Sequence, residues 1–581
     1  TMDVLEAIAT QTIAAIELRT DRLFVANHFV GPAVLLGDIA SLQRTDTPEH
    51  LERYERRLRA FPDFLETCAE IAREGVATGV VSPRIVVERA IAQVERLLDA
   101  PTHDSPALAA IAEDDAAGRD RIADVWTEVL VPAFGRSIEA LRDYLPHAAE
   151  DHAVTRLPSG EEIYAAEIRS WTTLPLDPRE VHELGLSRWD AVQQERFEVA
   201  ARLGYDDPAD AIAARKAAGE DTPASVEALV ALVEDQIQRS WDAAPAWFGR
   251  LPKANCRMKE IEAYRAADMA LAFYMPPTAD GERPGTYYLN TQDLEGKALH
   301  QIASVTYHEA NPGHHFQIAL EMEFDERPSL RRFGGLLAGS AFAEGWGLYS
   351  ERLADEMGLY LDDWERLGML AAQAHRAARL VTDTGLHAFG WSREDAIAKL
   401  EAGGSPHGES VTEVDRYIAL PAQALAYMTG MVEIQEARRR VEEKQGGDFD
   451  VRAFHDRILS LGQLPLPALR RELGKRASGR AAAGTRSGRA PRRRRPGRAS
   501  VEPPGSVRVP RHRRSRRSRR SRIRTICSLG TWRPSSGDRR TAEPGIPLRF
   551  LPANWQRSIP TPRFGSQNPP TSCSMRSEFP G

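Results

Sequence analysis

The segment VTYHEANPGHHFQIAL places three histidines and one glutamate within eight residues. His308 and Glu309 match the start of the zinc-peptidase pattern H-E-x-x-H, in which both histidines bind the metal and the glutamate activates water. Pro312 stands where the second histidine belongs, and the next histidines are His314 and His315. The chain has only 15 histidines, so this grouping favours a metal site over ordinary surface or core histidines.

The spacing of these histidines does not suit an unbroken helix. Counted from His308, a residue six positions on points about 120° away, and one seven positions on lies about 10.5 Å along the axis. Pro312 cannot continue the helical ladder and Gly313 tolerates unusual dihedral angles, so a bulge there can absorb two extra residues. The pattern favours His314 as the second ligand and His315 as a supporting or substrate contact, with His315 kept as the alternative ligand.

A third ligand is expected on another helix, because hydrolytic zinc sites use three protein ligands and one open position. Glu344, in the apolar run AFAEGWGLYSERL, lies 36 residues after His308 and is the candidate. A buried glutamate is rarely left unpaired, so its partner is either the metal or an arginine such as Arg331 or Arg332. Glu309 then serves as the general base.

The elements that must position these residues are predicted to be mostly helices, from residue 1 to about 475. Ala, Leu, Glu and Arg dominate this part, and Leu229, Val233 and Ile237 recur at helical spacing. The best strand signal is GTYYLNT, residues 285–291, which follows a segment rich in proline and glycine.

Composition divides the chain into three parts. Residues 1–150 look like a helical region without a chemical motif, residues 151–475 contain every candidate site residue, and residues 476–581 form a tail rich in Arg, Pro and Ser. The tail has 26 arginines, no lysine and four acidic residues. Of the chain's 76 basic and 83 acidic residues, residues 1–475 therefore hold 50 and 79. Such an acidic body argues against nucleic acid as its partner.

The tail has no periodic apolar face and is expected to be disordered. Its arginines fit an arm that binds nucleic acid or another acidic surface. Many arginines without any lysine are also what an out-of-frame translation of GC-rich DNA produces. We favour this frameshift interpretation for the chain beyond about residue 475.

Cysteines and apolar runs bear on the compartment. No pair of the four cysteines has C-x-x-C spacing, which indicates neither a disulfide framework nor a thiolate zinc site. No run of 18 apolar residues exists, so no membrane span is expected. No signal peptide is visible, and we expect a cytoplasmic protein, although Thr1 before Met2 leaves a lost leader open. The oligomeric state stays open.

Six blocks resemble the DUF885 family of bacterial proteins over roughly residues 20–475, and the resemblance implies a zinc-dependent hydrolase with a gluzincin-like pattern. The family implies a mainly α, metallopeptidase-like fold with a small β-sheet beside the active-site helix. It also implies one Zn²⁺ held by His308, His314 and Glu344, with Glu309 as general base. One departure is Ala422, where the family usually has glycine. The blocks are YYLNT (287–291), YHEANPGHHFQ (307–317), EGWGLYSERL (344–353), RLVTDTGLHAFGW (379–391), YIALPAQALAY (417–427) and FHDRILSLGQLPLPAL (454–469).

The same blocks supply candidates for the oxyanion and the substrate. Tyr417 and His387 are the first candidates for donors to a developing oxyanion, and Tyr427 is a further one at the substrate. Each is equally explained as a satisfied core residue. Arg376 and Arg379, on one helix, would meet a substrate carboxylate or neutralise the acidic body.

The predicted strand 285–291 offers another substrate contact. An extended peptide can add to the edge of a sheet, and Asn290 would then face that peptide.

Together these residues predict a zinc-dependent hydrolase, first of all a peptidase that cleaves peptide or small amide bonds with metal-activated water. Two alternatives stay open. One is a metal-dependent enzyme of specialised metabolism with a non-peptide substrate, and the other is a binding protein that has lost activity or binds nucleic acid through its tail. Another divalent metal is able to replace zinc in such a site.

Overall fold

Helices dominate the residues that this computed structural model describes, which are 1–474 without 262–265, 267–269 and 279–282. The prediction of a mainly α fold is confirmed, whereas the predicted disordered tail, 476–581, lies outside the described residues. The α-helices are α1 (Met2–Leu18), α2 (Asp21–Phe24), α3 (Pro32–Leu42), α4 (Pro48–Thr78), α5 (Arg84–Asp99), α6 (Ala116–Val125), α7 (Val131–Tyr144), α8 (Gly160–Thr172), α9 (Pro178–Arg202), α10 (Pro208–Ala217), α11 (Val226–Trp247), α13 (Leu299–Glu309), α14 (His314–Met322), α15 (Ser329–Phe333), α16 (Ala341–Glu356), α17 (Asp363–Ala388), α18 (Arg393–Glu401), α19 (His407–Ala419), α20 (Ala426–Gln445), α21 (Val451–Leu461) and α22 (Leu466–Gly474).

Several helices begin at the same short sequence signal, a capping residue followed by proline. Thr47, Asp177 and Asp207 each precede a proline at the first helical position and accept a backbone N–H of the first turn. Proline, which lacks a backbone N–H, costs no hydrogen bond at this position, because the first N–H groups of a helix have no partner inside the helix. Local sequence therefore fixes where α4, α9 and α10 start.

The three strands form one small sheet in the order β1-β3-β2, with β1 (Cys256–Glu260), β2 (Ala272–Met275) and β3 (Gly285–Leu289). β1 pairs with β3 in parallel, and β2 pairs with β3 antiparallel. β3 is thus the central strand, and both of its edges are already hydrogen-bonded. The prediction that an extended peptide adds to this strand is therefore wrong.

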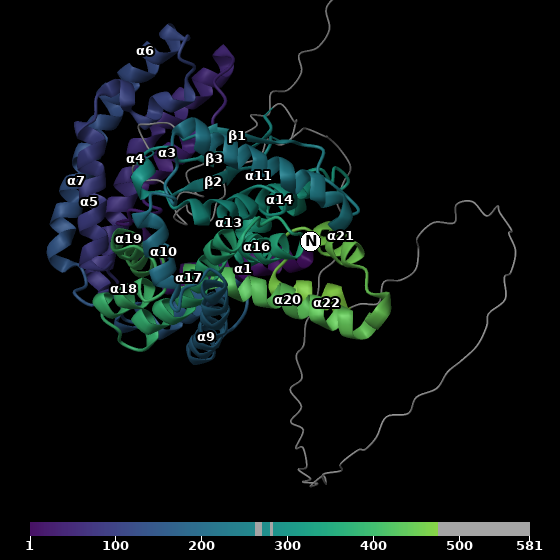
Figure 1. Ribbon diagram of the computed structural model, residues 1–581. Coiled ribbons are helices and arrows are strands. Elements are labelled where there is room, and N and C mark those ends of the chain that lie inside the picture. The colour runs from purple at the N-terminus through teal and green to yellow at the C-terminus, as the bar shows by residue number, and fades with distance from the viewer. Residues whose placement is uncertain (262–265, 267–269, 279–282, 475–581) are drawn as a thin grey trace, which may run out of the picture. The chain divides into compact units, whose positions relative to one another are not determined.

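The sheet lies beside α11 and α13, as Figure 1 shows. Leu229 and Val233 of α11, Tyr287 and Leu289 of β3, and Ile302 of α13 belong to one buried apolar cluster. Since burial of each large apolar side chain contributes roughly 1.5–3 kcal/mol, this cluster holds the sheet against the helix that ends in His308 and Glu309. The expected position of the sheet beside that helix is confirmed.

A second apolar cluster is made entirely of residues between Val25 and Ala148. It is built mainly from α3, α4, α5 and α7 and contains none of the candidate site residues. The predicted boundary near residue 150 stays a prediction.

Helices α16 and α20 approach each other closely enough that only glycine fits at their contact. A Cβ added to Gly345 would overlap the backbone of Gly430, and one added to Gly430 would overlap the carbonyl oxygen of Ala341. Because interiors are packed at crystal-like density, the backbone would have to shift to admit a methyl group. This contact sets the position of Glu344, the residue before Gly345.

We expect the substitution Gly345→Ala to destabilise the protein by about 1–3 kcal/mol, because overpacking forces α16 away from α20. Gly135→Ala is the matched control, since nothing lies within 4 Å of a Cβ added in α7. Replacing a helical glycine there stabilises by about 0.5–1 kcal/mol. Thermal and urea unfolding measure both changes, and equal stability of the two variants would contradict the close contact.

Candidate metal centre

The helix that carries His308 and Glu309 breaks before His314. α13 ends at Glu309, α14 begins at His314, and four residues connect them. A Cβ on Gly313 would overlap the carbonyl oxygen of His308, so glycine allows the chain to fold back at this point. The indole Nε1 of Trp346 on α16 donates to the carbonyl oxygen of Pro312 at 2.9 Å and holds the break in place.

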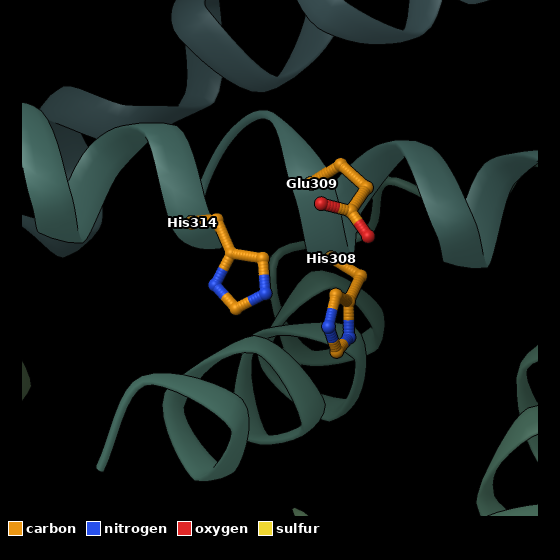
Figure 2. A group of neighbouring side chains, drawn as sticks. All are labelled: His308, Glu309 and His314. Carbon is orange, nitrogen blue, oxygen red and sulfur yellow. The ribbon is translucent and has the colours of Figure 1, made fainter. Parts of the chain in front are cut away.

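The break brings two imidazoles and one carboxylate together. The ring centroids of His308 and His314 lie 4.6 Å apart, and their planes are nearly perpendicular at 87°. One possible ligand atom each from His308, Glu309 and His314 lies within 4.8 Å of the others. Figure 2 shows these three side chains converging at the break in the helix.

Glu344 completes the group from α16. Its Oε2 lies 3.7 Å from Nε2 of His308 and 3.6 Å from Nε2 of His314. Ligand atoms about 2.0–2.1 Å from a tetrahedral Zn²⁺ lie about 3.4 Å from one another, so the distance from each imidazole Nε2 to Oε2 of Glu344 is close to that between two ligands of one metal. The alternative partners bond elsewhere, because Arg331 donates to carbonyl oxygens of residues 461 and 463 and Arg332 to that of Met322.

Glu351 holds the ring of His308 from behind, and sequence reasoning missed it. Its Oε1 accepts the Nδ1–H of His308 at 2.8 Å, so that Nε2 turns its lone pair toward Glu344. Ser304 and Gln373 donate to its other oxygen at 3.0 and 3.2 Å. A carboxylate on the far nitrogen is the usual support of a metal-binding histidine. The available signal was its place seven residues after Glu344, two helical turns along the same face.

The site favours a positive charge. Burial would lower the pKa of His308, but Glu344 and Glu351 outweigh it and raise this pKa to about 9. Burial likewise opposes ionisation of Glu344, yet hydrogen bonds from His308 and His314 hold its pKa well below the usual range. Burial raises the pKa of Glu309. Since three acids surround two imidazoles, the donor set fits a divalent cation.

The centre is open on one side. The side chain of His308 is only 5% exposed, whereas those of His314 and Glu344 are 12% and 21% exposed. A Cβ on Gly347 would come within 2.7 Å of the His308 ring, so glycine leaves the space in which that ring lies. A ligand can therefore approach from the side of His314 and Glu344.

His315 points away from this group and takes part in the packing of the sheet. Its Nδ1 accepts from the hydroxyl of Tyr274 at 3.0 Å, and its Nε2 donates to the carbonyl oxygen of Ala254 at 3.0 Å. Burial lowers its pKa to about 4. Because both nitrogens are occupied, the structure brings His314, and not His315, to His308.

His387 and Tyr417 are not free donors, which corrects their expected roles at the oxyanion. Nδ1 of His387 accepts from the N–H of Val154 at 3.2 Å, and Nε2 donates to the carbonyl oxygen of Tyr417 at 3.0 Å. The hydroxyl of Tyr417 donates to Glu413 at 2.8 Å. Both side chains are buried, and their polar atoms are hydrogen-bonded within the core.

Asn290 is also engaged by the protein. Its side-chain amide donates to the carbonyl oxygen of Ala266 at 2.7 Å, and its side-chain oxygen accepts the N–H of Gln292 at 3.1 Å. Both ends of its side-chain amide are bonded to the protein and fix the turn after β3, which corrects the expected substrate contact.

Arg376 and Arg379 lie one turn apart on α17, and Arg379 contacts Tyr427 of α20. Arg376 is close enough to lower the pKa of both Glu309 and Glu351. The guanidinium of Arg379 lies over the ring of Tyr427, 4.5 Å from its centroid. The structure therefore groups three of the four predicted substrate contacts.

Known proteins resemble the chain over most of its described length. A family model described as "Bacterial protein of unknown function (DUF885)" matches residues 1–473. A crystal structure titled as that of the "putative lipoprotein" from Colwellia psychrerythraea is 27% identical, with a TM-score of 0.74, and covers 78% of this chain and 80% of that one. A "putative lipoprotein of unknown function" from Shewanella oneidensis is 17% identical with a TM-score of 0.57, covers 81% and 86%, and supports the fold alone. No curated protein matches.

Within the described part of the chain, no helix is both long and apolar enough to cross a membrane.

Buried His387 makes stability sensitive to acid. Burial lowers its pKa to about 4, whereas a histidine in the unfolded chain titrates near 6.5. Between these values the unfolded state binds a proton that the folded state refuses, so stability falls as the pH decreases. We expect a loss of about 2 kcal/mol from this residue between pH 8 and pH 5, measured by urea unfolding.

The variant His387→Gln should lose less stability than the parent over this pH range, although it is less stable at pH 8. His103→Gln, at an exposed position, is the control and should follow the parent. Equal acid losses in the parent and in His387→Gln would contradict the buried neutral imidazole.

Proposed function

The chain belongs to the DUF885 family of bacterial proteins, as its motifs predicted, and we propose that it is a metal-dependent hydrolase of peptide or amide bonds. One observation carries the proposal: Nε2 of His308 and Nε2 of His314 lie at nearly equal distances from Oε2 of Glu344, with Glu309 beside them. This is the donor set of a hydrolytic zinc site with a neighbouring general base.

His308, His314 and Glu344 would hold the metal, and zinc is our first choice because two imidazoles and one carboxylate suit it. When bound, the metal supplies a positive charge that acidifies water and polarises a carbonyl group. Glu351 keeps the proton of His308 on Nδ1, so that Nε2 stays available.

Glu309 performs the proton transfers. Its half-buried carboxylate accepts a proton from the attacking water, whose oxygen bonds to the carbonyl carbon of the substrate. As the C–N bond breaks, Glu309 passes this proton to the leaving nitrogen, which departs as the amine. Its pKa is raised by burial, which brings the carboxylate closer to the working pH of a general base.

The compartment is part of the proposal. The structure from Colwellia psychrerythraea is titled as that of a "putative lipoprotein", and this favours a location outside the cytoplasm over the cytoplasmic one expected from the sequence. Fractionation of the source organism with an antibody to this chain distinguishes the two.

The variant Glu309→Gln should keep its metal and lose turnover by about 10²–10⁴-fold, because it removes the general base and leaves the ligands in place. Metal analysis of the purified protein and cleavage of a peptide library, together with small amides, measure the two properties. Glu326→Gln, on an exposed residue beyond α14, should match the parent. Unchanged turnover in Glu309→Gln would remove this residue from the mechanism.

We further expect Glu351→Gln to weaken zinc binding by about 10–100-fold, because an amide supports the imidazole of His308 less than a carboxylate does. Competition with a zinc chelator measures the affinity. Glu356→Gln, on the same helix but paired with Arg438 at the surface, is the matched control. If both variants bind zinc as the parent does, the zinc site is not where we place it.

A further inference from the structure

A group of cationic and aromatic side chains lies beside the metal centre without a matching number of acids. We call it the Arg379 cluster. It joins α17, α19 and α20, and it consists of Arg376, Arg379, Glu413, Arg416, Tyr417 and Tyr427.

One carboxylate oxygen serves most of this cluster. Oε2 of Glu413 accepts from Nη2 of Arg379 at 2.9 Å, from Nη2 of Arg416 at 2.9 Å and from the hydroxyl of Tyr417 at 2.8 Å. Although burial opposes it, the two guanidiniums hold the pKa of Glu413 well below its usual range. Two cations thus share one anion, and a positive charge is left without a partner.

The cluster also keeps hydrogen-bond donors unused. Nη1 of Arg379, Nε of Arg376 and Nε of Arg416 are buried atoms without a hydrogen-bond partner among the described residues. Arg379 itself is only 7% exposed, so an unpaired donor there is costly unless a ligand satisfies it.

Asp383, the acid one turn beyond Arg379, does not supply the missing charge. Its Oδ1 accepts from the hydroxyl of Tyr164 at 2.6 Å, and both oxygens face the N–H of Ala422 at 3.2 and 3.0 Å. Burial raises its pKa to about 7, so it is only partly ionised near neutral pH.

α17 connects the cluster to the centre. Gln373 donates to Glu351 behind His308, while Arg376 and Arg379 follow three and six residues later, about 4.5 and 9 Å along the helix axis. Tyr427 lies one turn before Gly430, the residue that Gly345 contacts beside Glu344. The unused donors are therefore within the length of a small peptide from the proposed reacting bond.

We propose that the Arg379 cluster binds a carboxylate of the substrate close to the bond that is cleaved. Guanidinium groups form paired, charge-assisted hydrogen bonds with carboxylates, and the one positive charge of Arg379 and Arg416 that Glu413 does not balance matches one such anion. The free C-terminus of a peptide and an acidic side chain both present this chemistry. That the bound carboxylate belongs to a substrate rests on the proposed hydrolase function. The binding of a carboxylate is measurable without turnover.

The test is calorimetric binding of three N-acetylated tripeptides to the zinc-treated Glu309→Gln protein. The probes are trialanine as the free acid, the same peptide as its amide, and the amide with a central glutamate. We expect the free acid or the glutamate peptide to bind at least about 10-fold more tightly than the plain amide, and the tighter one identifies the source of the carboxylate. Equal affinities for all three, or no measurable binding of either acidic probe, overturn the proposal.

Two substitutions place the carboxylate at this cluster. Arg379→Gln and Arg376→Gln, each added to Glu309→Gln, should reduce the preference for the acidic peptide over the plain amide to less than about twofold. If Arg379→Gln does not fold, Arg376→Gln provides the test. Arg366→Gln, on the same helix but paired with Asp355, should keep the full preference. A preference that persists in both cluster variants overturns the assignment. A preference that is kept while the parent cleaves no peptide or amide instead contradicts the hydrolase function and leaves the carboxylate site standing.

Discussion

Close approach of α16 to its neighbouring helices is the constraint on which the rest of the site depends. Gly345 lets α16 touch α20 at Gly430. Two residues later on α16, Gly347 leaves space for the ring of His308. Glu344 immediately precedes Gly345 and lies one turn before Gly347, so a small shift of α16 would move it relative to both imidazoles. Packed interiors resist such shifts because they have little free volume. The ligand geometry is thus set by backbone contacts more than by the ligands themselves.

Electrostatics limits what this framework can hold. Glu309, Glu344 and Glu351 lie around two histidines, and buried charges without partners cost several kcal/mol each. A divalent cation offsets two of the three negative charges, and Arg376 lies where it can offset the third. The raised pKa of His308 has the same origin, since a proton on Nε2 is the cation available when no metal is bound. The three acids therefore favour a cation at this position.

Sequence reasoning succeeded where residues with a known chemistry stand next to residues that restrict the local backbone. The H-E pair, Pro312 and the following glycine predicted a broken helix and favoured His314 over His315 as the residue that returns to the first histidine, and helical periodicity predicted the mainly α fold. It failed where the role of a side chain depends on hydrogen-bond partners that are distant in the sequence. Glu351 serves His308 from another helix, and His387 is bonded to backbone atoms 30 and 233 residues away. The prediction that Asn290 contacts a substrate failed because β3 is the central strand of the sheet. The order of the strands cannot be read from the sequence of one strand.

The departure at Ala422 shows how the cationic cluster depends on its framework. Ala422 adopts a left-handed backbone with φ 68° in the turn between α19 and α20, a conformation that glycine adopts more readily. This conformation costs an L-residue about 1–2 kcal/mol, partly offset by burial of the methyl group. It directs the N–H of Ala422 to Asp383 on α17 and starts α20 so that Tyr427 covers Arg379. The turn therefore keeps a costly conformation because it joins the helices that place Arg379, whose Nη1 has no hydrogen-bond partner among the described residues.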